Sequence, residues 1–233
     1  MSTPTATEHD AAQRELATFV SSRVEPLQAE YLRDNRTGRA DSRLARLRRA
    51  ITTAPGEDPA VWELTLDGVP FASRTDEPSP SERAVHTALT LYAVHQQSQR
   101  VRVHQRGWSL GRAVRALVAS RDALGDAERE GAVRRRFDAL ISATSYDEIA
   151  YQLRGLVQQF RSADPPIPLD YGRLAEDLDA LQSRQRAPGV LLRWGRDYHR
   201  IHGRSQTAAS TDPQTPHQPS DQTDHDTDPE DLP

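Results

Sequence analysis

The histidines are the side chains of this sequence best suited to bind a metal ion. His86, His95 and His104 recur every nine residues. On a helix this spacing places successive members on opposite sides and about 13 Å apart along the axis. His199 and His202 lie three residues apart, without the glutamate of a zinc-protease motif. The spacing of the histidines therefore predicts no metal site.

The acids, serines and cysteines form no catalytic pattern. Glu176, Asp177 and Asp179 are the densest acidic cluster before the C-terminal tail. Glu176 and Asp179 are predicted to point away from the apolar side of their helix, so we interpret the cluster as a solvated face. A serine nucleophile needs a strand before its turn, and no strand is predicted before Ser109. The chain has no cysteine, which excludes thiol catalysis and thiolate metal sites. We therefore predict that the protein is not an enzyme and uses no cofactor.

The elements that carry these residues are predicted to be helices. Apolar residues recur at intervals of three and four along almost the whole chain, which predicts an all-α fold of about eight to nine helices. We expect two small helical subdomains, over residues 11–125 and 126–203, with a boundary at Gly125. The C-terminal tail, residues 204–233, is built mainly of Ser, Thr, Pro, Gln and Asp. This tail and residues 1–10 are predicted to be disordered.

Periodicity and capping residues place the individual helices. They are expected over Ala11–Val24, from Pro26 to Leu32, over Ala40–Ile51, from a cap at Ser81 to near residues 105–107, and from Ser109 to Gly125. Caps at Asp126 and Ser145 predict two more. Asp164–Pro168 is predicted to be extended, because each proline disfavours helix in the residue before it, and two further helices follow. Ala54–Pro80 is predicted to be a loop with one short helix and six buried apolar anchors: Val61, Trp62, Leu64, Leu66, Val69 and Phe71.

The cations of this chain are all arginine. The sequence has 30 Lys+Arg, and every one of them is Arg. Ser205–Pro233 holds seven of the 34 acids and no base. The remainder therefore carries 30 Arg against 27 acids, so a net charge of −4 conceals a basic body.

Three segments concentrate the arginines. Arg33–Arg49 holds seven Arg and two acids, Arg100–Arg136 ten Arg and four acids, and Arg184–Arg204 six Arg and one acid. Solvated helix faces usually interleave Glu with Arg at four-residue spacing, and these segments do not. Concentrated like charge opposes folding unless an anionic partner neutralises it. The alternative is that arginine is simply the surface cation of a GC-rich genome.

Phosphate is the anion that this pattern favours, because the planar guanidinium group can bind two phosphate oxygens together. The sequence has no glycine-rich phosphate loop, no RNA-stacking aromatic motif and no zinc-finger spacing. We therefore expect contacts with the nucleic-acid backbone and no reading of the bases.

Several stretches, in order, resemble the CasB family, the small subunit of the type I-E CRISPR surveillance complex Cascade. They are Arg43–Ala50 (RLARLRRA), Ala88–Ser98 (ALTLYAVHQQS), Gly107–Ala113 (GWSLGRA), Arg134–Leu140 (RRRFDAL), Leu153–Phe160 (LRGLVQQF), Pro168–Leu178 (PLDYGRLAEDL) and Leu192–Arg200 (LRWGRDYHR). The resemblance implies a non-catalytic helical protein, present in two head-to-tail copies, that stabilises the R-loop. Its implied partners are the other Cascade subunits, a second copy of itself, CRISPR RNA, and single-stranded target or displaced DNA.

Helix faces and the resemblance together give the candidate nucleic-acid-binding residues. They are Arg43, Arg46, Arg48, Arg49, Arg112, Arg115, Arg135, Arg136, Arg154, Arg193, Arg196 and Arg200. No apolar run approaches the roughly 18 residues of a membrane span, and the N-terminus does not resemble a secretion signal. We therefore expect a cytoplasmic protein without a membrane or small-molecule partner.

Two other functions are compatible with the sequence. The first is a helical adaptor whose basic faces dock acidic protein subunits without contacting nucleic acid. The second is a helical transcription regulator, which is disfavoured because no helix-turn-helix with a polar recognition helix is evident.

Overall fold

The computed structural model describes residues 6–33 and 38–200, and the side chains from residue 14 onward. Within these residues the chain forms nine α-helices and one 3₁₀ turn, η1, and no β-strand beyond an isolated bridge between His104 and Leu169. The predicted all-α class is confirmed. The predicted C-terminal tail, residues 204–233, lies outside the described residues.

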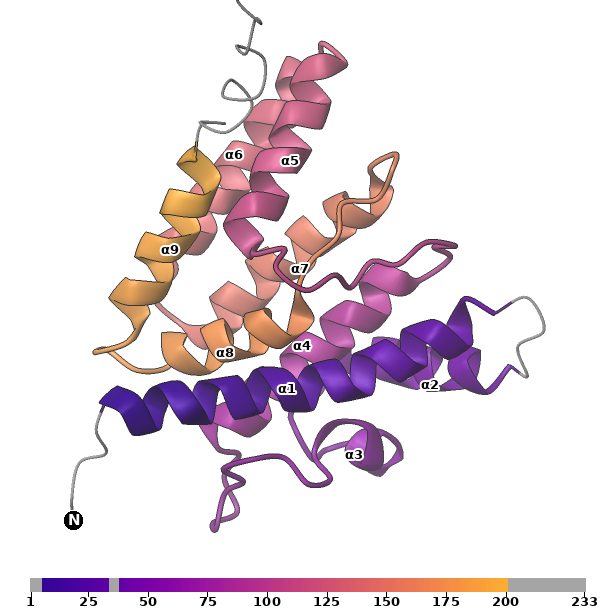
Figure 1. Ribbon diagram of the computed structural model, residues 1–233, viewed down its shortest axis with the longest axis vertical. Helices are drawn as coiled ribbons and strands as arrows, with labels where there is room; N and C mark the ends of the chain where they lie inside the picture. Colours follow the sequence, from indigo (N-terminus) through magenta and orange to yellow (C-terminus); the bar gives the residue numbers. More distant parts are fainter. Residues whose placement is uncertain (1–5, 34–37, 201–233) are drawn as a thin grey trace, which may run out of the picture. The chain divides into compact units, whose positions relative to one another are not determined.

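Figure 1 shows the helices in chain order. Their bounds are α1 (Ala6–Tyr31), α2 (Arg39–Arg49), η1 (Ala50–Thr52), α3 (Pro59–Thr65), α4 (Pro80–Gln96), α5 (Leu110–Ala123), α6 (Ala127–Ile141), α7 (Tyr146–Ser162), α8 (Tyr171–Leu181) and α9 (Ala187–His199). The predicted caps Ser109, Asp126 and Ser145 accept backbone N–H groups at the starts of α5, α6 and α7.

The central helix of the core is α4, which packs against α1, α2, α7 and α8. The cap was expected at Ser81, but the cap is Ser79. The Ser79 hydroxyl accepts the Glu82 N–H, and the Glu82 carboxylate accepts the Ser79 N–H. Ser81 instead donates its hydroxyl to Asp179 at 2.9 Å. The helix also ends at Gln96 and not near residue 105, because the Gln96 amide donates to the carbonyls of the following turn.

The first helix is longer than predicted. We expected a break before Pro26, yet α1 runs through it as one helix. Pro26 is exposed, whereas Val24 and Leu27 beside it are buried in the core, where α1 packs against α8, α4 and α2. A proline inside a helix costs about 3 kcal/mol, and burial of the apolar stripe on both sides of Pro26 offsets that cost.

The segment between η1 and α4 contains one short helix, α3, as predicted. Val61, Leu66 and Val69 are buried, as expected of anchors. Trp62 and Phe71 were predicted to be buried as well, but they are 50% and 53% exposed. The anchor prediction was therefore wrong for the two aromatic residues.

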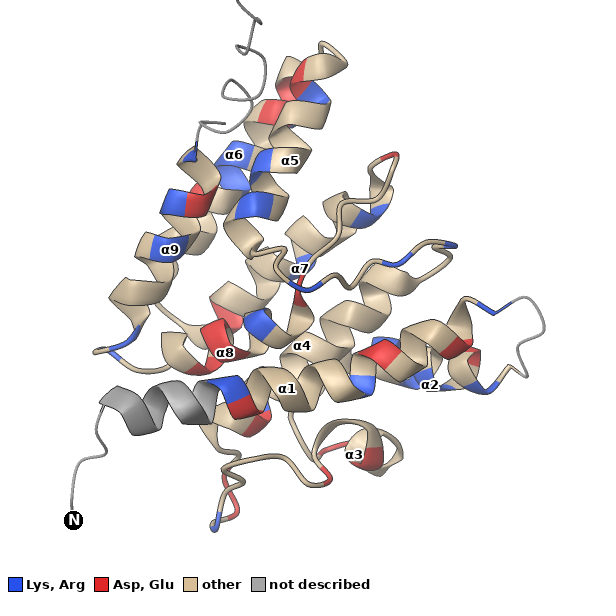
Figure 2. Ribbon diagram, in the orientation of Figure 1, with Lys and Arg blue, Asp and Glu red and all other residues tan. Residues whose placement is uncertain are grey.

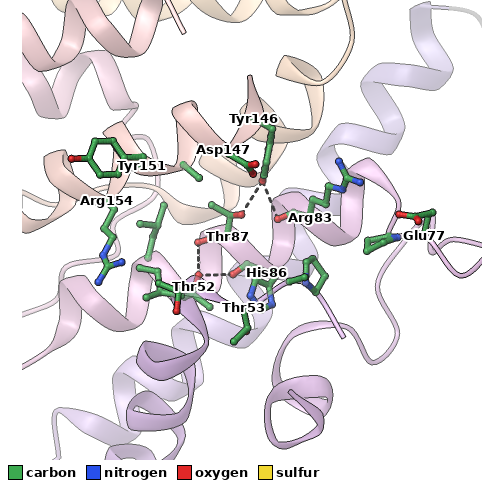
Figure 3. Close-up of a pocket in the computed structure, with 17 residues that line it drawn as sticks. Thr52, Thr53, Glu77, Arg83, His86, Thr87, Tyr146, Asp147, Tyr151 and Arg154 are labelled. Atoms are coloured by element: carbon green, nitrogen blue, oxygen red, sulfur yellow. Dashed lines mark hydrogen bonds between the residues drawn. The ribbon is translucent and has the colours of Figure 1, made fainter. Parts of the chain in front are cut away.

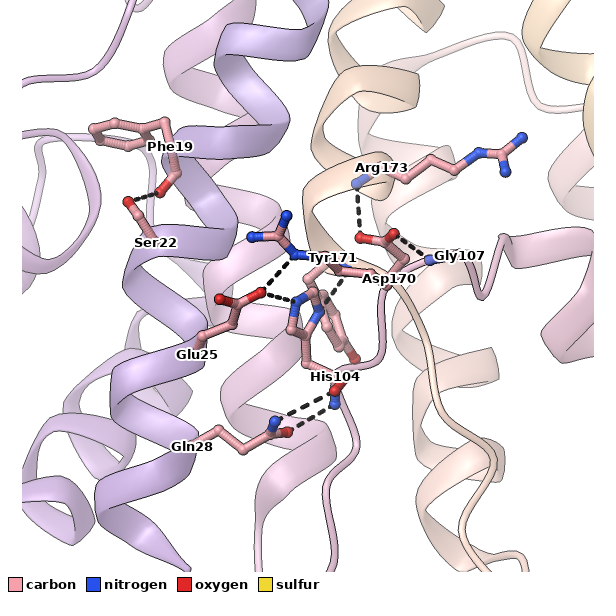
Figure 4. Close-up of polar contacts among 10 residues, drawn as sticks. Phe19, Ser22, Glu25, Gln28, His104, Gly107, Asp170, Tyr171 and Arg173 are labelled. Carbon is pink, nitrogen blue, oxygen red and sulfur yellow. Dashed lines mark hydrogen bonds and ion pairs between the residues drawn. The ribbon is translucent and has the colours of Figure 1, made fainter.

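A polar network fixes the loop before α5 against α1 and α8 (Figure 4). The Gln28 side chain accepts the His104 N–H at 2.8 Å and donates to the His104 carbonyl at 3.3 Å. His104 Nδ1 accepts the Tyr171 N–H at 3.1 Å, and Asp170 accepts the Gly107 N–H at 2.8 Å. Burial lowers the pKa of His104, so this histidine serves the fold as a neutral acceptor.

Helices from the two sides of residue 125 pack against one another. α1 and α4 contact α8, while α5 contacts α6 and α9. The division into two subdomains at Gly125 stays a prediction. None of the helices in the described part of the chain is long and apolar enough to span a membrane.

Candidate nucleic-acid interface

The arginines of α2 lie on both flanks of its buried face. Leu44 and Leu47 fill the core, whereas Arg46 and Arg49 are exposed. Neither of these two guanidinium groups pairs with a carboxylate among the residues the structure describes. α2 therefore presents unneutralised positive charge, as its periodicity predicted.

The partly buried arginines of α2 have basic neighbours. Arg43 lines a small groove between α2 and α3, close to Arg23 of α1. On the other flank, burial lowers the pKa of Arg48, and the nearby charges of Arg49 and Arg161 add to that effect. Arg161 was not among the predicted residues, because it lies far along the chain on α7.

A second group of arginines comes together where α5, α6 and α9 pack (Figure 2). Arg115 of α5 donates to the carbonyl of Arg200 at 2.5 Å. Arg134 of α6 donates to the Tyr198 hydroxyl of α9 at 2.6 Å. The exposed Arg112 stacks on the Trp108 ring at 4.0 Å, so its charge is held in place by an aromatic neighbour four residues earlier.

Close approach of α5 and α9 makes this grouping possible. Gly111 is buried against the backbone of α9, and a Cβ atom there would collide with the carbonyl oxygen of Trp194. Trp194 is itself fully buried. Gly111 therefore lets α9 lie directly on α5 and brings Arg200 to Arg115.

Arg154 is the candidate that α7 carries. It lines a groove of about 690 Å³, together with Thr52 and Thr53 just after α2 (Figure 3). Its chain neighbour Gly155 is covered by the guanidinium group of Arg136 from α6. Candidates on α7 and α6 thus lie close together, whereas the candidates of α2 do not line this groove.

The groove itself is balanced in charge. Arg83 and Arg154 line it, but so do Glu77 and Asp147. Figure 3 shows Arg154 beside Tyr151 at one end and Arg83 toward the other. The net positive charge therefore lies on the helix faces and not in this groove.

The structure gives Arg193 a different environment from its neighbours on α9. Arg193 donates to Asp177 at 2.7 Å, and the second oxygen of that carboxylate accepts the Trp194 indole N–H at 2.6 Å. Arg196 and Arg200 are exposed and form no ion pair within the described residues. The exposed Arg135 of α6 extends along its own helix over Gly131.

The acidic cluster of α8 is not the solvated face that we predicted. Asp177 is 2% and Asp179 8% exposed. Asp179 accepts a hydrogen bond from the Ser81 hydroxyl at 2.9 Å and one from the Arg186 guanidinium group at 2.8 Å. Burial raises the pKa of Asp177. Burial, together with the negative charges of Asp177 and Asp170, also raises the pKa of Glu176 to about 7. The sequence interpretation failed because the apolar face of α8 is wider than its leucines indicate.

The three regularly spaced histidines do not share a common ligand position: His95 and His104 both contact Tyr171, whereas His86 contacts Ala50. His86 Nε2 donates to the carbonyl oxygen of Ala50 at 3.0 Å, and His95 Nδ1 is 2.9 Å from the Tyr171 hydroxyl. Burial lowers the pKa of His95 to about 3. In the part of the chain that the structure describes, no three His, Asp or Glu side chains gather as metal ligands do.

The fold and surface define a class of all-helical protein that presents exposed arginines on several helix faces. A family model for CRISPR-associated protein Cse2 matches residues 43–199. The chain is 40% identical to CasB from Thermobifida fusca, with a TM-score of 0.63 over 79% of this chain and 98% of that one. CasB from Thermus thermophilus is 25% identical, with a TM-score of 0.55 over 78% and 96%. No protein of curated function matches the chain.

The chain belongs to the Cse2 family of CRISPR-associated proteins, also named CasB, whose members are subunits of Cascade. This confirms the resemblance carried by the sequence stretches. The roles of the individual arginines stay predictions.

Proposed function

We propose that this protein is the non-catalytic small subunit of a type I-E Cascade complex in the cytoplasm. Its exposed arginines hold the phosphate backbone of single-stranded nucleic acid, without reading the bases, and so stabilise the R-loop. Six candidate arginines carry the proposal because they are exposed and form no ion pair with a described residue: Arg46, Arg49, Arg112, Arg135, Arg196 and Arg200.

Unpaired guanidinium groups suit this task for an energetic reason. A paired arginine must give up its carboxylate before it can bind a phosphate, whereas an exposed unpaired one exchanges only water and counterions. Binding then releases the counterions of the nucleic acid, which makes affinity fall as salt concentration rises. In this proposal CRISPR RNA and a second copy of the chain lie alongside the bound strand in the assembled complex.

The test is binding of the purified full chain to labelled single-stranded DNA of two unrelated sequences between 50 and 200 mM salt. We expect equal affinity for both sequences and a linear fall of log affinity with log salt, with a slope of about −0.7 per phosphate contacted. Affinity that does not change with salt would contradict phosphate contact.

Arg46→Glu and Arg74→Glu form a matched pair for this experiment. Both reverse one exposed arginine, but Arg74 lies in the acidic segment before α4. We expect Arg46→Glu to lower the salt slope by about one contact, and Arg74→Glu to leave it unchanged. If the purified chain binds no DNA but still assembles with its protein partners, the adaptor function is favoured instead.

A further inference from the structure

The segment between η1 and α4 has the opposite charge to the rest of the surface. Residues 54–79 contain six acids and one arginine. Figure 2 shows acidic positions on α3 and along the loop that follows it. We call the exposed side chains of residues 54–79 the acidic–aromatic surface. Its exposed acids are Glu57, Glu63, Asp67, Asp76 and Glu77.

Two large aromatic side chains are exposed on this surface. Trp62 is 50% and Phe71 53% exposed. One edge of the Trp62 ring covers Gly56, where a Cβ atom would lie 3.2 Å from the ring. Exposed tryptophan and phenylalanine are costly in water and are enriched in the energetic centres of protein interfaces. The acids around them therefore surround a patch suited to burial against a partner.

The backbone holds Phe71 outward in an unfavourable conformation. Its φ is 60°, in the left-handed region that bulky residues rarely adopt. The segment before it is fixed to α1, because Arg23 donates to the carbonyl of Glu63 at 2.9 Å and to that of Asp67. Strain of this kind persists where the surrounding structure enforces it, and it is common at binding sites. The aromatic side chains are thus positioned before any partner arrives.

We propose that the acidic–aromatic surface docks a lysine- and arginine-rich face of a different protein subunit of the complex. Its acids would repel nucleic acid and attract basic side chains. Trp62 and Phe71 would bury their rings against the partner and accept stacked guanidinium groups. This inference does not rest on the proposed nucleic-acid binding, since it concerns side chains of opposite charge; the two surfaces meet at the groove that Glu63 and Arg46 both line.

A photo-crosslinker identifies the occupant directly. Trp62→p-benzoylphenylalanine would be introduced into the full chain, the chain assembled with the other subunits and RNA, and the crosslinked peptide identified by mass spectrometry. A crosslink to a basic segment of another protein subunit is expected. A crosslink to nucleic acid or to a second copy of this chain, or no crosslink in the assembled complex, would overturn the proposal.

Phe71→Gly separates docking from folding. Glycine adopts a φ of 60° without strain, so the thermal midpoint of the isolated chain should stay equal or rise. Retention in the complex should nevertheless weaken on the order of tenfold, because an aromatic anchor is lost. Leu124→Ala removes a side chain that is 73% exposed elsewhere and should leave retention unchanged.

Measuring DNA binding as well separates the docking proposal from the proposed nucleic-acid function. Affinity of the Phe71→Gly chain for single-stranded DNA should equal that of the unmodified chain. Retention equal to that of the unmodified chain would overturn the docking proposal, whatever the DNA result. Loss of retention in a chain that binds no DNA would support docking and contradict only the proposed nucleic-acid function.

Discussion

α2 and α9 carry similar sequence patterns but use their arginines differently. Both helices place arginines at three- and four-residue spacing opposite an apolar stripe. In α2, Arg46 and Arg49 are exposed and form no ion pair with a described residue. In α9, Arg193 binds Asp177 of α8, which also accepts the Trp194 N–H. Equal spacing has produced a free face in one helix and a structural ion pair in the other.

The difference comes from the helix packed alongside and not from the helix that carries the arginines. A buried carboxylate must have its hydrogen bonds satisfied, and Asp177 is 2% exposed. Arg193 therefore serves the fold first, while Arg196, three residues later, is exposed and free of ion pairs within the described residues. Arginines are best ranked as phosphate ligands by whether a buried acid faces them.

Gly111→Ala should have the largest effect, because it disrupts the packing of α9 on α5. The new methyl group would collide with the Trp194 carbonyl, and a backbone atom cannot swing aside as a side chain can. We expect a loss of about 3 kcal/mol in the free energy of unfolding, as is found for overpacked sites. Urea unfolding measures it. Gly195→Ala, where a Cβ atom would meet nothing within 4 Å, is the control and should be neutral or slightly stabilising. Equal stability of the two variants would contradict the close approach of α5 and α9.

Asp177→Ala should have the next largest effect. The substitution leaves the Trp194 indole N–H buried without its acceptor and releases Arg193. An unsatisfied buried donor costs about 1–3 kcal/mol, so we expect a loss of about 2 kcal/mol in urea unfolding. Asp138→Ala removes an exposed acid from α6 and should change stability by less than about 0.5 kcal/mol. A loss no larger than that of Asp138→Ala would show that Asp177 does not organise α9.

Arg193→Gln and Arg196→Gln test the comparison within one helix. Arg193 is 45% exposed, so its ion pair is screened, and we expect Arg193→Gln to cost about 1 kcal/mol of stability. Arg196→Gln should leave stability unchanged and lower the salt slope of DNA binding by about one contact. The prediction fails if both variants change the same measurement to the same extent.

Most of the fold could be predicted from the sequence because local chemistry decides it. Capping residues such as Ser109, Asp126 and Ser145 mark helix starts, and apolar spacing marks buried faces. The errors arose where residues far apart in the sequence determine the local structure. Nothing near Pro26 indicates that packing against α8 and α4 will keep α1 continuous. Nothing near Asp177 indicates that its carboxylate will accept the indole N–H of Trp194.

The candidate site could be predicted only in part. Helix periodicity correctly predicted that Arg46, Arg112 and Arg196 are exposed, since the direction of a side chain from its helix depends on local spacing. Periodicity could not find Arg161, which meets Arg48 only after α7 has packed into place. Nor could it separate Arg193 from Arg196, because the acid that distinguishes them lies on α8.

The smallest predicted effect concerns pH and the acidic side of α8. Burial first, then the charges of Asp177 and Asp170, raise the pKa of Glu176 from 4.5 to about 7, while Arg173 and Arg193 oppose the shift. The folded state therefore binds this proton more tightly than the unfolded state does. Its contribution to stability is present below pH 4.5 and is lost as the pH rises toward 7.

Glu176→Gln should remove that pH dependence, because glutamine does not ionise. The side chain is partly exposed, so the gain is screened. We expect the variant to be more stable than the unmodified chain at pH 8, by less than about 1 kcal/mol, and the difference to shrink at pH 5. Urea unfolding at the two pH values measures it. If the stability difference between the variant and the unmodified chain were the same at pH 5 and pH 8, Glu176 would have the same pKa in the folded and unfolded states. Burial of acids on α8 would then concern Asp177 and Asp179 alone.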